Sequence, residues 1–311
     1  MKQSRRIKIK IHEGSEEKCI QCQQKITDGS KIVEIEADAE TEINKFYKPG
    51  KYHLLCLAIQ KYFIAFIDIL GFSKLTLELP LRRIYEIIEQ FFATARSSRV
   101  EASIGRETRP IADIPYIVLS DSIILYQIVK PPLDVKDFLE WKETIFSQFL
   151  TSLESIFQEA FKRNLHLRGG VSYGECYISP ESGEDSIKIE HILIGRPFTE
   201  AVKMEGLQSW MGVAFHPSMS EYLEKSTLKE SLIEYDIPLK ENSCTKDFPK
   251  CTIAWVDASM EKYRKHFDQW QTENSRQEEI KSNTIKFFEE HITRNSPLRH
   301  IGSIVLNPDH D

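Results

Sequence analysis

An almost unbroken apolar run from Tyr62 to Phe72 constrains this chain most, because it contains a single carboxylate, that of Asp68. The run is rich in Phe and Ile, and Gly71 closes it with a turn, so it predicts a buried strand that ends near Asp68. A buried carboxylate without a partner destabilises a fold by several kcal/mol. The strand therefore predicts a cation, a basic side chain or backbone N–H groups beside Asp68.

Helix and strand patterns alternate after this run. Apolar residues recur at three- and four-residue steps over 81–95 and over 138–160, which predicts two amphipathic helices. Between them, residues 114–128 predict two strands joined by a polar tip at Ser120, Asp121 and Ser122. The remaining expected elements are strands at 165–177, 188–194 and 210–215 and a helix at 197–208.

This order of elements predicts an α+β fold of the ferredoxin-like kind, an antiparallel sheet with helices on one face. We expect three parts: a small zinc-binding module over 1–58, the α+β domain over 59–257, and a helical extension over 258–311. The 41% of hydrophobic residues is enough for a full core.

Charge and hydropathy exclude some classes of protein. The net charge of −6 argues against a nucleic-acid coat, although residues 2–10 form a local basic patch. No apolar run reaches the roughly 18 to 20 residues that span a bilayer, and the N-terminus lacks the apolar core of a signal peptide. The sequence therefore predicts a cytoplasmic protein without a membrane partner.

Asp121 lies in a second apolar stretch, and on the expected sheet its strand pair lies beside the strand that ends at Asp68. Two converging carboxylates suit a hard divalent cation, Mg²⁺ or Mn²⁺. A pair of such ions about 4 Å apart can activate an attacking hydroxyl and stabilise a leaving oxygen. The alternative is that Asp68 only caps a turn and Asp121 only fills a hairpin tip.

Three segments resemble the class III nucleotidyl cyclases, the family of adenylate and guanylate cyclases. Residues 66–73 (FIDILGFS) are similar to the metal-binding strand of that family, and residues 119–123 (LSDSI) to its second metal hairpin, with Ser120 where glycine is usual. Residues 195–205 (GRPFTEAVKME) are similar to its asparagine-and-arginine helix. Together the segments cover roughly residues 62–257.

The resemblance implies a two-metal cyclase that acts as a head-to-tail homodimer with shared active sites. The ribose 3′-oxygen would attack the α-phosphorus, and pyrophosphate would leave. The implied metal ligands, for two Mn²⁺ or Mg²⁺ ions per site, are Asp68, Asp121 and the carbonyl of Ile69. The implied triphosphate loop is Leu70, Gly71, Phe72 and Ser73.

Two residues of the segment 195–205 also depart from the family pattern. Thr199 stands at the asparagine position, and Lys203 stands at the position of the transition-state arginine. A lysine neutralises phosphate charge as a point charge, without the planar fork of arginine. Lys203 would act across the dimer interface, or it lies on a solvated helix face. The departures also leave open a degenerate cyclase fold that senses a nucleotide without turning it over.

The positions that select the base in the family are Ile117 and Ile192 here, and isoleucine cannot hydrogen-bond a purine edge. With the IDILGF motif, this looks most like the pyrimidine cyclases of bacterial Pycsar anti-phage defence, which make cyclic UMP or cyclic CMP. The implied substrate is UTP, in preference to CTP. One alternative is an adenylate cyclase with relocated base contacts. Another is a metal-dependent nuclease or polymerase-like enzyme, but the sequence offers neither a third carboxylate nor a basic template channel for that activity.

The N-terminal part contains two ligand pairs, Cys19 with Cys22 and His53 with Cys56, each at the two-residue spacing that suits one tetrahedral Zn²⁺. Four protein ligands predict a structural zinc with no open position. The alternative is a set of core cysteines without metal. Residues 18–56 resemble the zinc finger of poly(ADP-ribose) polymerases, and whether this module binds DNA, protein or only its own cyclase domain stays open.

Overall fold

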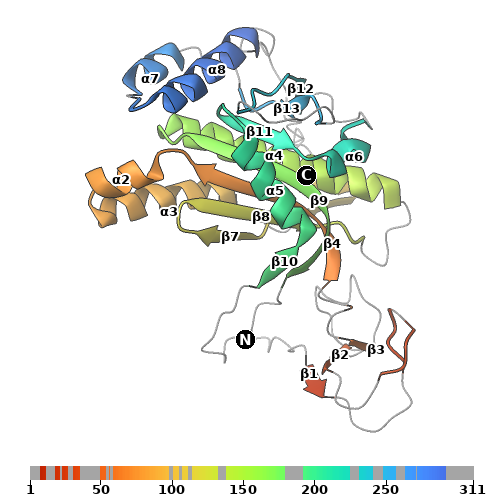
Figure 1. Cartoon of the computed structure of the whole chain (residues 1–311). Helices are drawn as coiled ribbons and strands as arrows, with labels where there is room; N and C mark the ends of the chain where they lie inside the picture. The colour runs from red at the N-terminus through yellow and green to blue at the C-terminus, as the bar shows by residue number, and fades with distance from the viewer. Residues whose placement is uncertain are drawn as a thin grey trace, which may run out of the picture.

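The computed structural model describes residues 8–11, 18–21, 23–26, 31–35, 50–53, 56, 59–97, 101–104, 107–110, 114–131, 138–178, 192–224, 231–240, 248–256, 263–270 and 272–291 (Figure 1). A sheet lies at the centre, with strand order β10-β9-β4-β8-β7 and β11 paired to β9. Its strands are β4 (Ile59–Ile69), β7 (Tyr116–Leu119), β8 (Ser122–Ile128), β9 (Leu167–Ile178), β10 (Leu193–Gly195) and β11 (Gly212–Phe215).

Helices pack around this sheet, and short strand ladders accompany it. The helices are α2 (Phe72–Glu78), α3 (Leu81–Ser97), α4 (Phe138–Lys162), α5 (Arg196–Leu207), α6 (Ser220–Glu224), α7 (Tyr263–Gln269) and α8 (Ser275–His291), with the 3₁₀ turn η2 (Pro217–Met219). The ladders join β5 (Glu101–Ile104) to β6 (Glu107–Pro110) and β12 (Leu232–Glu234) to β13 (Cys251–Ile253).

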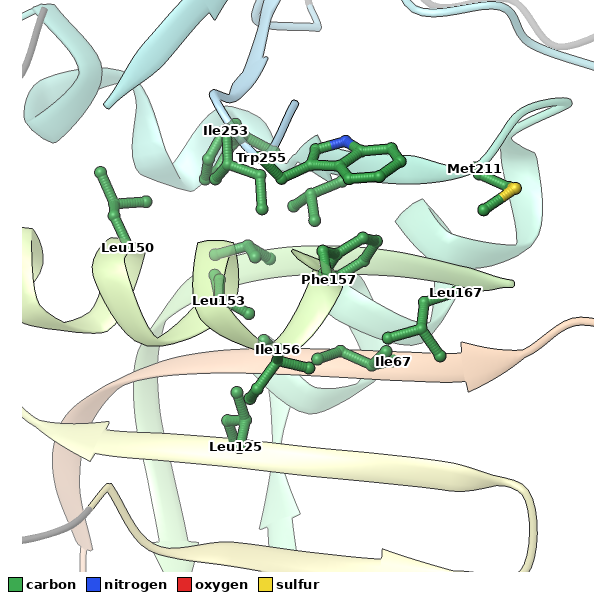
Figure 2. Packing of buried hydrophobic residues seen from close by; sticks show 14 of the residues in the cluster. Ile67, Leu125, Leu150, Leu153, Ile156, Phe157, Leu167, Met211, Ile253 and Trp255 are labelled. Atoms are coloured by element: carbon green, nitrogen blue, oxygen red, sulfur yellow. The ribbon is translucent and has the colours of Figure 1, made fainter. Parts of the chain in front are cut away.

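β4 lies in the middle of the sheet, and its side chains point alternately into two cores on opposite faces. Ala65 and Ile67 point to the large core built with α4, whereas Ile64 and Phe66 belong to a smaller core on the other face. Figure 2 shows Ile156 of α4 on the side of Ile67, and the ring of Phe157 beside that of Trp255. Burial on both faces explains the nearly continuous apolar run in the sequence.

The expectation of helices on one face of the sheet is wrong. α4 covers one face, but α5 packs on the other, where Ala201 joins the smaller core. Gly170 of β9 permits this contact, since a Cβ there would lie 2.0 Å from the carbonyl oxygen of Ala201. β11 is also a parallel neighbour of β9, so the sheet is not wholly antiparallel. The α+β class itself is confirmed.

The last two helices complete the large core. Phe267 of α7 and Phe287 and Phe288 of α8 are fully buried there, and the ring of Trp255 lies 5.3 Å from that of Phe288 between centroids. The same cluster includes Phe161 of α4. The helical character expected for this segment is therefore found, and its aromatic side chains are part of the core that supports the sheet.

The N-terminal part contains a three-stranded antiparallel sheet of β1 (Lys8–Ile11), β2 (Lys31–Ile35) and β3 (Gly50–His53). Cys19 is buried and Cys56 is partly exposed. Cys22 and the side chain of His53 lie outside the described residues, so the zinc site stays a prediction. Among the helices that the structure describes, none is long and apolar enough to cross a membrane.

Candidate functional site

Asp68 and Asp121 meet at one end of the central sheet. Asp68 is the penultimate residue of β4, and in the ladder it lies opposite Ser122, the residue after Asp121. The N–H of Ile69 donates to the carbonyl oxygen of Asp121 at 3.0 Å. The hydroxyl of Ser122 donates to Oδ1 of Asp68 at 3.3 Å. The two acidic residues predicted from the sequence are therefore neighbours across adjacent strands.

The turn between β7 and β8 presents Asp121. Ser120 adopts a left-handed conformation with φ of 56°, at the position where a two-residue hairpin favours glycine. A non-glycine residue in this region stores about 1 kcal/mol of strain or more. Ser120 is exposed and Asp121 is partly buried, so the turn holds its carboxylate at the rim of the sheet.

The pKa of Asp68 is raised to about 6, mainly because burial disfavours the charged carboxylate. The negative charges of Glu205 and Asp121 add to this rise. Arg168 and the hydrogen bond from Ser122 oppose it. The corner of the sheet therefore has an excess of negative charge, which a bound cation would neutralise.

Arg168 and Glu205 form a buried ion pair beside Asp68. Arg168 lies on β9 directly opposite Asp68, and its Nε donates to Oε1 of Glu205 on α5 at 2.5 Å. Both side chains are almost inaccessible to solvent. A second guanidinium nitrogen, Nη1, donates to the carbonyl oxygen of Gln208 at 3.2 Å. This pair fixes α5 to the sheet next to the carboxylates.

Gln208 extends the buried network. Its Nε2 donates to the carbonyl oxygens of Gly169 at 2.8 Å and Met204 at 2.9 Å, and its Oε1 accepts from the indole N–H of Trp210 at 2.9 Å. Sequence reasoning missed this network. The signal was present as an arginine inside an apolar strand and as Glu205 on the same helix face as Ala201, since these positions are four residues apart.

The loop after Asp68 begins with a hydrogen bond from Leu70 N–H to the carbonyl oxygen of His166 at 2.8 Å. Gly71 has φ of 77°, which favours glycine, and a Cβ there would meet no atom within 4 Å. α2 starts at Phe72, and the residues Gly71 and Ser73 are exposed. The apolar pattern alone indicated only a turn here, whereas the resemblance to class III cyclases implied a helix N-terminus at this loop, and α2 begins there.

Thr199 and Lys203 lie on the exposed side of α5. The buried side of that helix, which contains Ala201 and Glu205, packs on the sheet. Thr199 and Lys203 therefore point away from the sheet of their own chain, and Glu205 is the α5 residue whose charge acts on Asp68. A role for Lys203 in the site of a second copy stays a prediction.

The two expected base-selecting residues differ in environment. Ile117 on β7 is 8% exposed and packs in the smaller core with Ile124. Ile192 precedes β10 and is 38% exposed. The choice of base stays a prediction.

A metal-binding cluster of three or more His, Cys, Asp or Glu side chains is not found within the described part of the chain. At the sheet corner, the carboxylates of Asp68 and Asp121 are the candidate donors. Two carboxylates with carbonyl oxygens are the ligands that Mg²⁺ and Mn²⁺ prefer, and Mg²⁺ usually shares its shell with water and substrate phosphates. This donor set fits an open divalent site.

Solved structures of cyclases resemble this chain. The adenylyl cyclase CyaB from P. aeruginosa is 14% identical, with 63% of this chain and 94% of that chain covered and a TM-score of 0.37. The guanylyl cyclase Cya2 is 12% identical, with 63% of this chain and 90% of that chain covered and a TM-score of 0.35. A bacterial light-regulated adenylyl cyclase is 18% identical, covering 56% and 83%, with a TM-score of 0.33. No family model and no curated protein matches the sequence.

Proposed function

We propose that this chain is a nucleotide cyclase that converts UTP, or CTP, to the 3′,5′-cyclic monophosphate and pyrophosphate. The observation that carries the proposal is the convergence of Asp68 and Asp121 at one end of the sheet, where Ile69 N–H binds the carbonyl oxygen of Asp121. The resemblance of residues 66–73, 119–123 and 195–205 to class III cyclases supports the same activity.

Asp68, Asp121 and the carbonyl of Ile69 would hold two Mg²⁺ or Mn²⁺ ions. When bound, such ions supply charge neutralisation at the phosphates and favour the ionised form of an attacking hydroxyl. The raised pKa of Asp68 supports this assignment, because burial, its largest cause, and the charges of Glu205 and Asp121 all disfavour an ionised carboxylate that a bound divalent cation would stabilise.

In the proposed reaction, the bond from the ribose 3′-oxygen to the α-phosphorus forms while the bond to the bridging oxygen of pyrophosphate breaks, and the hydroxyl proton passes to water. Ser122 orients Asp68 through its hydrogen bond. The buried pair of Arg168 and Glu205 keeps α5 fixed beside the carboxylates. Such an active site works mainly by positioning and charge neutralisation.

A homodimer with shared active sites completes the proposal. Lys203 would neutralise phosphate charge in the site of the partner, with Thr199 beside the substrate. Their exposure on the outer side of α5 supports this arrangement, because an outward lysine is accessible to a second copy. The backbone of Leu70, Gly71, Phe72 and Ser73 would wrap the triphosphate.

The preference for a pyrimidine rests on Ile117 and Ile192, which offer no hydrogen bond to a purine edge. With this preference, the chain would make a second messenger in anti-phage defence, as the Pycsar cyclases do. A structural Zn²⁺ bound by Cys19, Cys22, His53 and Cys56 would fold the N-terminal module. The candidate ligands of this module are DNA, a protein, or only the cyclase domain of its own chain.

The test is to incubate the purified full chain and Mn²⁺ separately with UTP, CTP, ATP and GTP and to identify products by mass spectrometry. We expect cyclic UMP, with cyclic CMP as the next product. Asp121→Asn should lower turnover at least about 100-fold, as for loss of a group needed only in the transition state. Asp236→Asn, which changes an exposed carboxylate in the segment after β12, is the matched control.

The outcomes separate the alternatives. Cyclic AMP as the main product would support an adenylate cyclase and remove the pyrimidine assignment. Tight nucleotide binding without any product would favour a nucleotide-sensing fold, for which Thr199 and Lys203 at the asparagine and arginine positions are the motivating features. Equal turnover by Asp121→Asn and the unaltered chain would remove the metal assignment.

A further inference from the structure

A cavity of about 310 Å³ lies between α2, the turn from α4 to β9, and the two C-terminal helices (Figure 1). This volume is at the lower end of the range for small-molecule sites, roughly 300 to 1,000 Å³. Neither Asp68 nor Asp121 is among the residues that line it. The cavity is therefore separate from the carboxylate pair, although Leu70 and Gly71 of the adjoining loop form part of its wall.

Three aromatic rings meet in one wall of the cavity. The rings of His166 and Trp270 lie 4.0 Å apart between centroids, and Nε2 of His166 is 3.1 Å from Nε2 of His266. One of these nitrogens must donate and the other accept, so at least one ring is neutral. Burial lowers the pKa of His166 to about 3 and that of His266 to about 4, so both are neutral near pH 7.

The remaining polar lining is made of neutral amides and a compensated charge. Asn164, Gln269 and Gln277 are the amide residues of the lining, and Oε1 of Gln277 also accepts from the N–H of Glu273 at 2.7 Å. The Nζ of Lys74 lies 3.0 Å from Oε1 of Glu273 and 3.6 Å from Oε1 of Glu78. The lysine charge is therefore balanced by carboxylates, which disfavours an anionic ligand such as a free phosphate.

We propose that this cavity binds a neutral planar heterocycle of nucleobase or nucleoside size. Side-chain amides both donate and accept hydrogen bonds, as the edge of a nucleobase does. Trp270 offers an aromatic surface of the kind on which bases stack. The volume admits one such molecule.

An occupant acts on the loop after Asp68. His166 lines the cavity with its ring, and its carbonyl oxygen accepts the hydrogen bond from Leu70 N–H at 2.8 Å. Lys74, three residues into the helix that follows Gly71, is held by Glu273 from the C-terminal part. A ligand that moves His166 or Trp270 therefore changes the position of residues 70–74. The effect of the ligand on residues 70–74 matters for turnover only if the proposed cyclase activity holds, whereas the binding of the ligand does not depend on that activity.

Binding is tested on the full chain without nucleotide triphosphate or divalent cation. Adenine, cytosine, uracil, nicotinamide, adenosine, cytidine and uridine are titrated separately, with detection by saturation-transfer NMR. We expect at least one probe to bind with Kd below about 1 mM. Trp270→Ala should weaken that binding about tenfold or more, as for loss of a stacking partner. Gln277→Leu, which removes one amide, should weaken it in the same direction if Trp270→Ala fails to fold.

Two control variants locate the site. Asp268→Ala changes an exposed residue on the same helix as Gln269 that does not line the cavity, and it should bind the probe as the unaltered chain does. Asp121→Asn should also leave binding unchanged. Absence of binding by every probe, binding unaffected by both Trp270→Ala and Gln277→Leu, or binding lost in Asp121→Asn would overturn the site.

The effect on the loop has its own readout. Turnover with the bound probe at saturation should change at least about twofold in the unaltered chain and not in Trp270→Ala. Binding without a change in turnover would overturn the effector role, but the proposal of a binding site would stand. If the chain turns over no nucleotide, the proposed cyclase function fails while the binding result stands, so the two failures are distinguishable.

Discussion

Asp68 combines an apolar strand with a charge that its surroundings disfavour. Its pKa of about 6 lies above the ordinary value of 3.8, so between these two pH values the folded chain binds a proton that the unfolded chain has lost. The free energy of unfolding of the metal-free protein therefore falls as pH rises through this window. Above it, the ionised carboxylate destabilises the fold until a cation binds.

Replacing this charge should reveal its effect. Asp68→Asn keeps an oxygen that accepts from Ser122, and it should stabilise the metal-free protein at pH 7.5 by about 1 kcal/mol, a figure reduced for solvent screening. The melting temperature should rise by roughly 2 °C at pH 7.5 and stay unchanged at pH 4. Turnover should fall at least about 100-fold. Differential scanning fluorimetry and product analysis measure both effects.

Added Mn²⁺ provides the complementary measurement. It should raise the melting temperature of the unaltered chain, because a ligand that binds only the folded state stabilises it, and have little effect on Asp68→Asn. Asp236→Asn is again the control, since its carboxylate is largely exposed. Destabilisation of Asp68→Asn at pH 7.5 would show that the carboxylate stabilises the fold without metal.

At the residue level, the sequence predicted the two carboxylates because charged residues inside apolar strands are unusual. It did not predict Glu205 as a neighbour of Asp68, because that contact depends on which face of the sheet α5 covers. Arg168 and Gln208 were missed for the same reason: buried ion pairs join residues far apart in the chain, and periodicity describes only local order.

Among the elements, α5 approaches the sheet closely at Gly170. A Cβ at Gly170 would lie 2.0 Å from the carbonyl oxygen of Ala201 and 2.6 Å from the N–H nitrogen of Glu205, both backbone atoms. Gly170→Ala should therefore push α5 away from β9 and destabilise the chain by about 3 kcal/mol or more. The midpoint of urea unfolding measures the loss, and turnover should fall because Glu205 and Lys203 move with the helix.

Gly206 is the matched control on α5 itself. A Cβ there would meet no atom within 4 Å. Gly206→Ala should be neutral or stabilise the protein by up to about 1 kcal/mol, because alanine favours helix more than glycine does. Equal stability of the two variants would mean that α5 does not pack on β9 at Gly170.

Most elements of residues 59–257 were predictable from periodicity. The helices expected at 81–95 and 138–160 are confirmed as α3 and α4, and the two strands with a polar tip are confirmed as β7 and β8. Residues 179–191, which include part of one expected strand, lie outside the described residues. The side of the sheet that α5 covers was not predictable, because a helix with Ala201 and Met204 on one face suits either side.

Over the whole molecule, the C-terminal helices share the core of the sheet. Phe287 is fully buried, and its ring centroid is 4.8 Å from that of Trp210. Phe287→Ala should destabilise the protein by about 3 to 5 kcal/mol. Tryptophan fluorescence and circular dichroism should lose signal in one shared transition with urea, since the core is continuous.

An exposed residue of the same helix is the control for this variant. Glu279 of α8 is exposed, and Glu279→Ala should change the free energy of unfolding by no more than about 0.5 kcal/mol. Two separate transitions in Phe287→Ala, with the sheet unaffected by the first, would contradict a shared core.

The N-terminal module offers a prediction of metal content. We expect one Zn²⁺ per chain by mass spectrometry of the native protein, lost in Cys19→Ser and on treatment with a strong chelator. Cys176→Ser should keep the ion, because Cys176 is buried at β9 and donates to the carbonyl oxygen of Ile194. A native chain without zinc would show that these cysteines are only part of a core.

The pairing of β4 has a consequence for synthesis on the ribosome. β4 is flanked by β8 and by β9, and its partners in β9 are translated roughly a hundred residues later. Until then, one edge of a strongly apolar strand has no neighbour, and such edges invite association between nascent chains. Slow translation ahead of β9 should therefore lower the soluble yield, and a chaperone that shields extended apolar segments should restore it.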